Sequence, residues 1–85
     1  MPRSVFTQSY KSLLEVLVDM RKASGVTQVE LAKRLGKPQP WVSLYERGVR
    51  RIDVIEFVAI AKALGVKPEK MFERVLAKMP KQIEI

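Results

Sequence analysis

Residues 27–48 have the sequence Thr27-Gln-Val-Glu-Leu-Ala-Lys-Arg-Leu-Gly36-Lys-Pro-Gln-Pro-Trp41-Val-Ser-Leu-Tyr-Glu46-Arg-Gly48. Thr27 is a good helix cap, and Glu30 stands at the position from which a capping box reaches back to it. Leu31 and Leu35 recur at helical spacing, which indicates one apolar face. Gly36 then supplies the left-handed backbone that ends a helix and turns the chain sharply. The stretch therefore predicts two short helices joined by a tight turn.

The second of these helices is expected to pack closely on the first. Ala32 carries only a methyl group and lets the other helix approach, while Val42 and Tyr45 are spaced to point back at it. The side chains left on the outward face are Gln39, Pro40, Ser43, Leu44 and Arg47. In a helix-turn-helix, this is the face that meets the major groove of DNA.

These residues, in this order, resemble the Cro/CI-type (XRE) helix-turn-helix family. The match comprises Thr27-Gln28, Glu30-Leu31-Ala32, Leu35-Gly36, Gln39, Val42-Ser43 and Tyr45-Glu46-Arg47-Gly48, and continues from Ile52 to Gly65 within an overall span from Leu13 to Phe72. The resemblance implies an all-α fold, a compact five-helix lambda-repressor-like DNA-binding domain. It also implies a transcriptional regulator, most simply a repressor that binds an inverted-repeat operator in double-stranded DNA as a homodimer.

The basic residues are concentrated around the same stretch. The chain carries a net charge of +7, from 16 Lys and Arg and 9 Asp and Glu. Of these, residues 21–51 hold eight basic residues and two acids. A solvated basic surface kept for solubility is the simpler alternative. The coincidence of the excess charge with the helix-turn-helix favours a polyanionic partner instead.

Composition excludes several kinds of chemistry. The absence of Cys removes disulfides and thiolate sites, and the absence of His removes the commonest metal ligand and general base. Ser43 and Lys33 are isolated nucleophiles without a partner base, so we expect no enzyme, cofactor or metal site. No apolar core of a secretion signal follows Arg3, and no window is long enough to span a membrane. These features predict a cytoplasmic protein that is not associated with membranes.

One domain over residues 1–85 is expected, with flexible tails at 1–8 and 80–85. The first helix is expected over about residues 9–23, with Leu13, Leu14, Leu17, Val18 and Met20 buried. A further helix should start after Asp53, with Glu56 completing a capping box and an apolar face of Ile55, Phe57, Val58, Ile60, Ala61 and Leu64. The last helix should begin at Pro68 and end at Pro80. Residues 81–85 are either a frayed tail or a short dimerising strand.

Base contacts are expected from Gln39, Pro40, Ser43 and Leu44. The amide of Gln39 can pair with both N6 and N7 of adenine, and the base-contacting glutamine of the family aligns there. Pro40 disfavours helical backbone at the preceding residue, so Gln39 is expected to cap the helix with non-helical geometry. Leu44 departs from the polar residue usual in the family, and partial burial is the alternative to contact with a thymine methyl.

Phosphate contacts are expected from Thr27, Gln28, Lys37, Trp41, Arg47, Arg50 and Arg51. In the family, the position of Gln28 contacts a phosphate, and the loop that carries the arginines follows the DNA backbone. Guanidinium groups suit phosphate oxygens. An exposed glutamine and solvated arginines are the simpler alternatives. For Trp41, the alternative is packing on the first helix of the motif or on the Arg50 loop.

Two further sets of residues have structural or assembly roles by the same resemblance. Arg21 and Glu46 stand where the family has a buried or half-buried ion pair. The last helix supplies the candidate dimer interface, with Phe72, Val75, Leu76 and Met79, unless these side chains belong to the intramolecular core. A protein-interaction module, either a coactivator-like bridge or the antitoxin of a toxin pair, is the alternative function, and its other protein would then be an additional partner.

Overall fold

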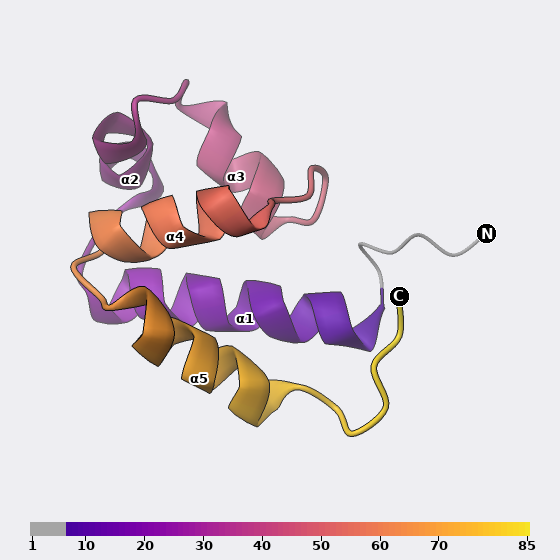
Figure 1. Cartoon of the computed structure of the whole chain (residues 1–85). Coiled ribbons are helices and arrows are strands. Elements are labelled where there is room, and N and C mark those ends of the chain that lie inside the picture. The colour runs from indigo at the N-terminus through magenta and orange to yellow at the C-terminus, as the bar shows by residue number, and fades with distance from the viewer. Residues whose placement is uncertain (1–6) are drawn as a thin grey trace.

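Five helices follow one another along residues 7–85, the part of the chain that the computed structural model describes. They are α1 (Gln8–Ala23), α2 (Gln28–Leu35), α3 (Pro40–Glu46), α4 (Val54–Ala63) and α5 (Pro68–Lys78). No strand occurs in these residues, and the all-α, five-helix prediction is confirmed (Figure 1). None of the five helices is long and apolar enough to cross a bilayer.

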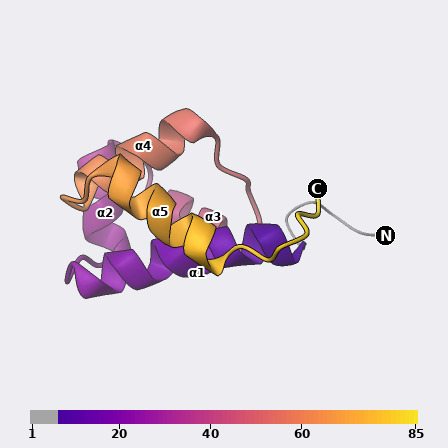
Figure 2. The same cartoon turned by 60° about the horizontal axis from the view of Figure 1, so that its bottom comes forward.

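The helix-turn-helix and the last helix lie on different sides of the molecule. α2 contacts α3 and α4, while α1 contacts α3 on one side and α5 on the other. α5 packs on α1 and α4 only, within the described residues. Figures 1 and 2 both show α5 alongside α1, and in Figure 1 it lies on the other side of α1 from α2 and α3. The outward surfaces of α3 and of α5 are therefore free of each other.

Helix boundaries follow from capping side chains. The Thr27 hydroxyl accepts a hydrogen bond from the Glu30 N–H at 3.0 Å, as predicted. The Glu30 carboxylate accepts from Arg34 Nε at 3.2 Å, one turn further on, so the reciprocal half of that capping box is not formed. The box at Asp53 and Glu56 forms in both directions, at 2.7 and 2.9 Å. Gly36 ends α2 with a φ of 68°, the left-handed conformation that its lack of a Cβ permits.

The start of α1 corrects the predicted tail. Thr7 caps the helix by accepting from the Tyr10 N–H at 3.1 Å, and Gln8 is already helical. Residues 7–8 are thus ordered parts of the fold, while the rest of the predicted tail, 1–6, lies outside the described residues. The prediction missed Thr7 because the apolar periodicity that defines α1 begins only further along the helix.

The core contains most of the expected apolar positions, with one clear exception. Leu14, Leu17, Ile60, Ala61 and Leu64 are buried, and Tyr10 and Val16 join them without having been predicted. Ile55 was expected on the buried face of α4 but is 76% exposed. Ile55 comes five residues before Ile60, which faces the core. At about 100° per residue, this spacing places the two side chains about 140° apart around the helix axis. The broad apolar face predicted for α4 is therefore too broad.

The C-terminal residues return to the start of α1 rather than forming a strand. The Glu84 N–H donates to Ser9 Oγ at 3.0 Å, and the Gln8 N–H donates to the Glu84 carboxylate at 3.3 Å. In Figure 1, this last segment ends beside the first turn of α1. As a single chain these residues form no strand and are joined to α1 by these two hydrogen bonds, while their flexibility and any part in a dimer stay predictions. A carboxylate at a helix N-terminus is favourable because free N–H groups and the helix dipole meet it there.

Candidate nucleic-acid interface

α3 has one buried face and one outward face. Val42 and Tyr45 are completely buried, which confirms that they face inward as predicted. On the other side Gln39, Pro40 and Arg47 are exposed, whereas Ser43 and Leu44 are half-buried. The half-burial of Leu44 agrees with the alternative raised for it. Arg47 lies along the same face, and its Nε donates to Ser43 Oγ at 3.2 Å.

Gln39 is the cap of α3, and its backbone differs from the expectation. The helix begins at Pro40 as predicted, but Gln39 has φ −50° and ψ −43°, which is helical. A hydrogen bond of 3.0 Å from the Trp41 N–H to the Pro38 carbonyl closes a tight turn around Gln39. This turn offsets the usual preference against helical geometry before proline. The Gln39 side chain makes no capping bond and is exposed.

A shallow hollow joins the start of α2 to the start of α3. Its lining residues are Gln28, Val29, Gln39, Pro40 and Ser43. The residue expected at a phosphate, Gln28, thus lies around the same hollow as three residues expected at bases. Thr27, also expected at a phosphate, is exposed at the cap of α2, and Lys37 is exposed in the turn.

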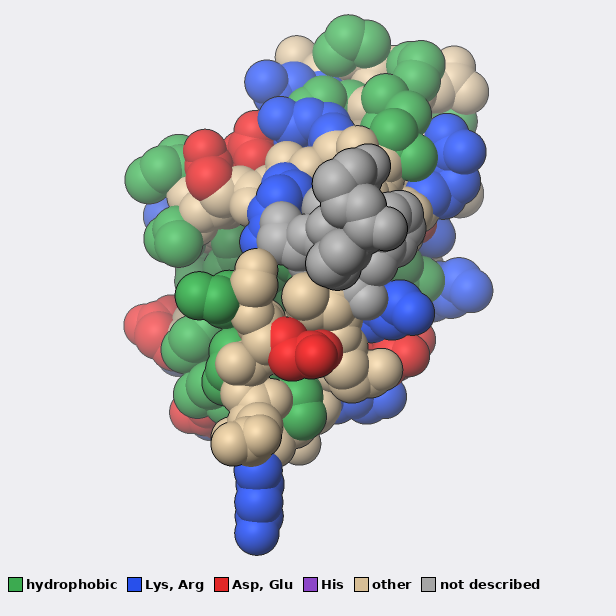
Figure 3. All heavy atoms as spheres, turned by 90° about the vertical axis from the view of Figure 1, so that its right-hand side faces the viewer, with side chains coloured by type: hydrophobic (Ala, Val, Ile, Leu, Met, Phe, Trp, Pro, Cys, Tyr) green, Lys and Arg blue, Asp and Glu red, His purple; other side chains and the backbone are tan. Residues whose placement is uncertain are grey.

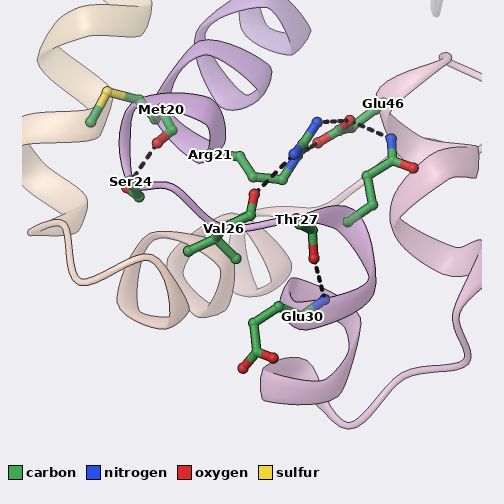
Figure 4. A network of polar contacts seen from close by, with 8 residues as sticks. Met20, Arg21, Ser24, Val26, Thr27, Glu30 and Glu46 are labelled. Carbon is green, nitrogen blue, oxygen red and sulfur yellow. Dashed lines mark hydrogen bonds and ion pairs between the residues drawn. The ribbon is translucent and has the colours of Figure 1, made fainter.

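Gln28, which lines this hollow, is held by a buried ion pair. Arg21 contacts the Glu46 carboxylate twice, from Nε at 2.7 Å and from Nη2 at 3.1 Å, so the predicted pair is present. The Gln28 amide donates to Glu46 Oε1 at 2.8 Å. The hydrogen bond that Arg21 donates to Glu46 raises the pKa of Arg21 above its ordinary value. Figure 4 shows Arg21 between Glu46 and the Val26 carbonyl, to which it donates at 2.9 Å.

This network fixes the elements of the motif relative to α1. Glu46 comes from the end of α3, Gln28 from the start of α2 and Arg21 from α1. The side chains of Arg21 and Glu46 are only 11% and 5% exposed. The contact between Gln28 and Glu46 was not predicted, since no local pattern relates residues so far apart in the sequence. One of the two amide hydrogens of Gln28 remains for an outside acceptor.

Trp41 contacts two cations. The Arg50 guanidinium is 4.8 Å from the centre of the Trp41 ring, and Lys37 Nζ is 5.5 Å from it. The ring also meets Tyr45 edge to face at 5.3 Å between centroids. Arg50 is further bound to Glu56, with Nη2 to Oε2 at 3.2 Å. Trp41 therefore packs on the Arg50 loop, the alternative raised for it, and holds cations that a phosphate can approach.

Arg51 differs from Arg47 and Arg50, because its side chain donates no hydrogen bond to another residue from 7 to 85. Its guanidinium lies 4.3 Å from the centre of the Tyr10 ring, and no ion pair or hydrogen bond of its side chain occurs within residues 7–85. It is exposed. Figure 3 shows Lys and Arg side chains among hydrophobic ones over the upper part of the molecule, where Figure 1 places α3 and the loop that follows it.

The chemistry of this surface suits an anionic, hydrogen-bonding partner. Exposed guanidinium and ammonium groups attract phosphates, and the amide of Gln39 can both donate to and accept from a base edge. Within residues 7–85, no group of three or more acidic side chains is arranged to hold a metal ion.

Residues 17–71 match the model of the helix-turn-helix family. An XRE-family like protein from Pseudomonas syringae pv. tomato str. DC3000 is 43% identical, with 85% of this chain and 88% of that chain covered and a TM-score of 0.78. This chain belongs to the XRE family of helix-turn-helix proteins. As an XRE-family member, it is a DNA-binding transcription regulator, and α2 and α3 are its helix-turn-helix.

A second solved structure supports the same fold for this XRE-family chain. The clp gene regulator ClgR from C. glutamicum superposes with a TM-score of 0.74 over 96% of this chain and 100% of that chain, at 23% identity. Sequence comparison with curated proteins gave no significant match.

Proposed function

We propose that this XRE-family protein is a transcriptional repressor that acts as a homodimer on an inverted-repeat operator in double-stranded DNA. The observation that carries the proposal is the hollow shared by Gln28 and Gln39 on the outward side of the helix-turn-helix. It combines an amide suited to a phosphate with an amide suited to an adenine edge. The excess of basic residues over the motif supplies the electrostatic attraction. Action on DNA in this way implies a cytoplasmic protein.

In this proposal, the outward face of α3 contacts bases through Gln39, Pro40, Ser43 and Leu44. Around it, the residues that contact phosphates are Thr27, Gln28, Lys37, Trp41, Arg47, Arg50 and Arg51. Contact by Leu44 is limited to the part of its side chain that α3 leaves uncovered. Arg50 forms an ion pair with Glu56, so its contribution to phosphate binding is smaller than that of an unpaired arginine.

The dimer is proposed to form through α5 and the neighbouring start of α4. Phe72 and Leu76 are 51% and 55% exposed, which is unusual for large apolar side chains side by side on one helix. Phe72 helps to line an apolar groove of about 230 Å³, and Leu76 follows it one helical turn further along α5. The other residues that line the groove are Leu13, Ile52, Asp53, Val54, Phe57, Val75 and Met79. Protruding side chains beside a groove on one face are what a two-fold, self-complementary interface needs.

Val75 does not belong to the proposed interface. It is only 2% exposed and packs in the core, as the alternative for this set foresaw, while Met79 is half-buried at the edge of the groove. Val54, which is 74% exposed at the start of α4, is proposed as an interface residue instead of Val75. Because α5 packs away from α2 and α3, a dimer through this surface leaves both recognition helices open.

The same apolar surface favours one other function, binding to a different protein, as in an antitoxin or a coactivator-like bridge. Selection from a random duplex pool at two salt concentrations, combined with measurement of the molecular mass in solution, separates these functions. An inverted repeat with half-sites about 34 Å apart, together with a dimer mass, supports the homodimeric repressor. A monomer without a recovered motif, and with binding that disappears as salt rises, contradicts it and supports the protein-partner function.

A further inference from the structure

Three segments far apart in the sequence meet around Tyr10. The side chain of Tyr10 belongs to the first turns of α1 and is 6% exposed. Its hydroxyl accepts a hydrogen bond from the Ile52 N–H at 3.1 Å, and its ring carries the Arg51 guanidinium at 4.3 Å. Glu84 closes the same region through its bond to Ser9. Tyr10 is thus part of α1 but contacts the loop between α3 and α4.

This loop is anchored on both sides of Arg51. Before it, the N–H groups of Gly48, Val49 and Arg50 donate to carbonyls in the last turn of α3, at 3.0, 2.9 and 3.3 Å. After it, the Ile52 N–H is held by Tyr10 and the Asp53 N–H by the Glu56 carboxylate at 2.9 Å. The side chain of Arg51 therefore projects from a segment of backbone whose ends are fixed. Tyr10 supplies the anchor nearest to it.

The stacking of Arg51 on Tyr10 leaves its N–H groups available. A ring face attracts the guanidinium through its quadrupole, and this contact uses none of the N–H donors of Arg51 in a hydrogen bond to an oxygen. Arg47 and Arg50 differ, because each already donates to a protein oxygen. Among the three loop arginines, Arg51 is the one whose donors are not shared with another described residue.

We propose that Tyr10 is a positioning residue for DNA binding, which places Arg51 to contact a phosphate. Its ring holds the guanidinium in one orientation, and its hydroxyl fixes the backbone at Ile52. An arginine held in this way loses less conformational entropy on binding than a free one. This inference rests on the proposed function, since it assumes that the loop after α3 follows the DNA backbone.

The test measures affinity for random-sequence duplex DNA over a series of salt concentrations, for the full chain and its variants. Each phosphate contact contributes about 0.9 to the slope of log affinity against log salt. Arg51→Ala is expected to reduce the slope by about that amount for each bound protomer, and Tyr10→Leu to reduce it similarly without removing a charge. Lys70→Ala is the matched control, because Lys70 is an exposed cation paired with Glu73 on α5.

The salt slope separates positioning from a structural role. A variant that only lowers the folded fraction weakens binding equally at every salt concentration and keeps the slope. A wild-type slope in Tyr10→Leu, with a reduced slope in Arg51→Ala, overturns the positioning role. A wild-type slope in Arg51→Ala overturns it as well. If the wild-type protein itself does not bind DNA, the proposed function fails instead.

Tyr10→Phe keeps the test valid if Tyr10→Leu does not fold. It retains the ring under Arg51 and removes only the hydroxyl that anchors Ile52. We expect severalfold weaker binding from Tyr10→Phe alone, and no additional weakening when it is added to Arg51→Ala. Full additivity of the two changes shows independent action and overturns the proposal.

Discussion

The Glu46 carboxylate lies 2.7 Å from Nε of Arg21, in a contact that solvent barely reaches. The pair joins α1 to the end of α3 and is surrounded by hydrogen bonds from Gln28 and to the Val26 carbonyl. Taking two charges out of water is costly, and only this complete set of partners offsets the cost. The loss of one partner should therefore be more harmful than the loss of both.

Arg21→Ala should lower the free energy of unfolding by about 3–5 kcal/mol, because it leaves the Glu46 carboxylate buried without its cation. Urea denaturation measures the change. Lys70→Ala, which removes a pair whose side chains are 70% and 69% exposed, should cost less than about 1 kcal/mol. A similar small cost for Arg21→Ala would show that water reaches Glu46 and replaces the arginine.

Tyr45→Phe should leave the protein as stable as the wild type or more stable, by about 1 kcal/mol. The Tyr45 hydroxyl is buried and has no hydrogen-bond partner among residues 7–85. Removal of the hydroxyl avoids the desolvation cost and retains the ring that packs on Trp41. A clear loss of stability in Tyr45→Phe would indicate that the hydroxyl binds a buried water.

The same hydroxyl makes stability depend on alkaline pH. Burial raises the pKa of Tyr45 above its ordinary value of 10.0. Above that pH the unfolded chain loses a proton that the folded chain keeps. The contribution of this group to the free energy of unfolding is therefore fully present below pH 10 and is lost as the pH rises further. The slope from one such group is about 1.4 kcal/mol per pH unit. Tyr45→Phe should lack this contribution in parallel denaturation series.

Gln39→Ala should relax the preference at one base pair of each half-site, at a cost of about 1–3 kcal/mol on the preferred sequence. The expectation follows from an exposed amide at the start of α3 that makes no hydrogen bond to any residue from 7 to 85. Arg50→Ala is the comparison, because loss of a phosphate contact weakens all sequences alike. Equal weakening of every sequence by Gln39→Ala in competition binding would refute base contact.

Glu56→Gln should raise the affinity for DNA. The change removes the negative charge that lies beside Arg50. A glutamine can still accept from the Asp53 N–H and keep the capping box. The gain should be comparable to a partly exposed ion pair, up to about 1 kcal/mol. Thermal denaturation serves as the control for the cap. Unchanged affinity in Glu56→Gln would show that Arg50 lies away from the phosphates.

Leu76→Lys should prevent dimerisation without unfolding the monomer, because Leu76 is 55% exposed. Sedimentation equilibrium measures the mass, and circular dichroism checks the fold. Met71→Ala is the contrasting change: Met71 is fully buried on the same helix, so its truncation should cost about 2–5 kcal/mol of stability. A dimer that persists in Leu76→Lys would move the interface away from α5.

Local signals in the sequence were sufficient for much of the fold. Thr27, Gly36 and the Asp53–Glu56 box act through neighbours within one helical turn, and each ends or begins a helix where expected. The Ile55 prediction failed because a continuous apolar run hides which side of a helix faces the core. Only the packing of α4 against its neighbours decides that side.

Less of the candidate site than of the fold could be predicted from the sequence. The outward residues of α3 followed from helical spacing, but the bonds from Gln28 to Glu46 and from Ile52 to Tyr10 join residues 18 and 42 positions apart. No periodicity or spacing rule relates such pairs. The return of Glu84 to α1 is of the same kind, since it depends on where α5 ends in space.

The division of α3 into two faces bears on how proteins of this kind diversify. Val42 and Tyr45 alone are fully buried on this helix, and the exposed positions 39, 40 and 47 contribute no side chain to the core. Substitutions at those exposed positions can therefore accumulate with little effect on folding. In evolution, or in a library built on this scaffold, new target sequences can be explored while the rest of the protein is inherited unchanged.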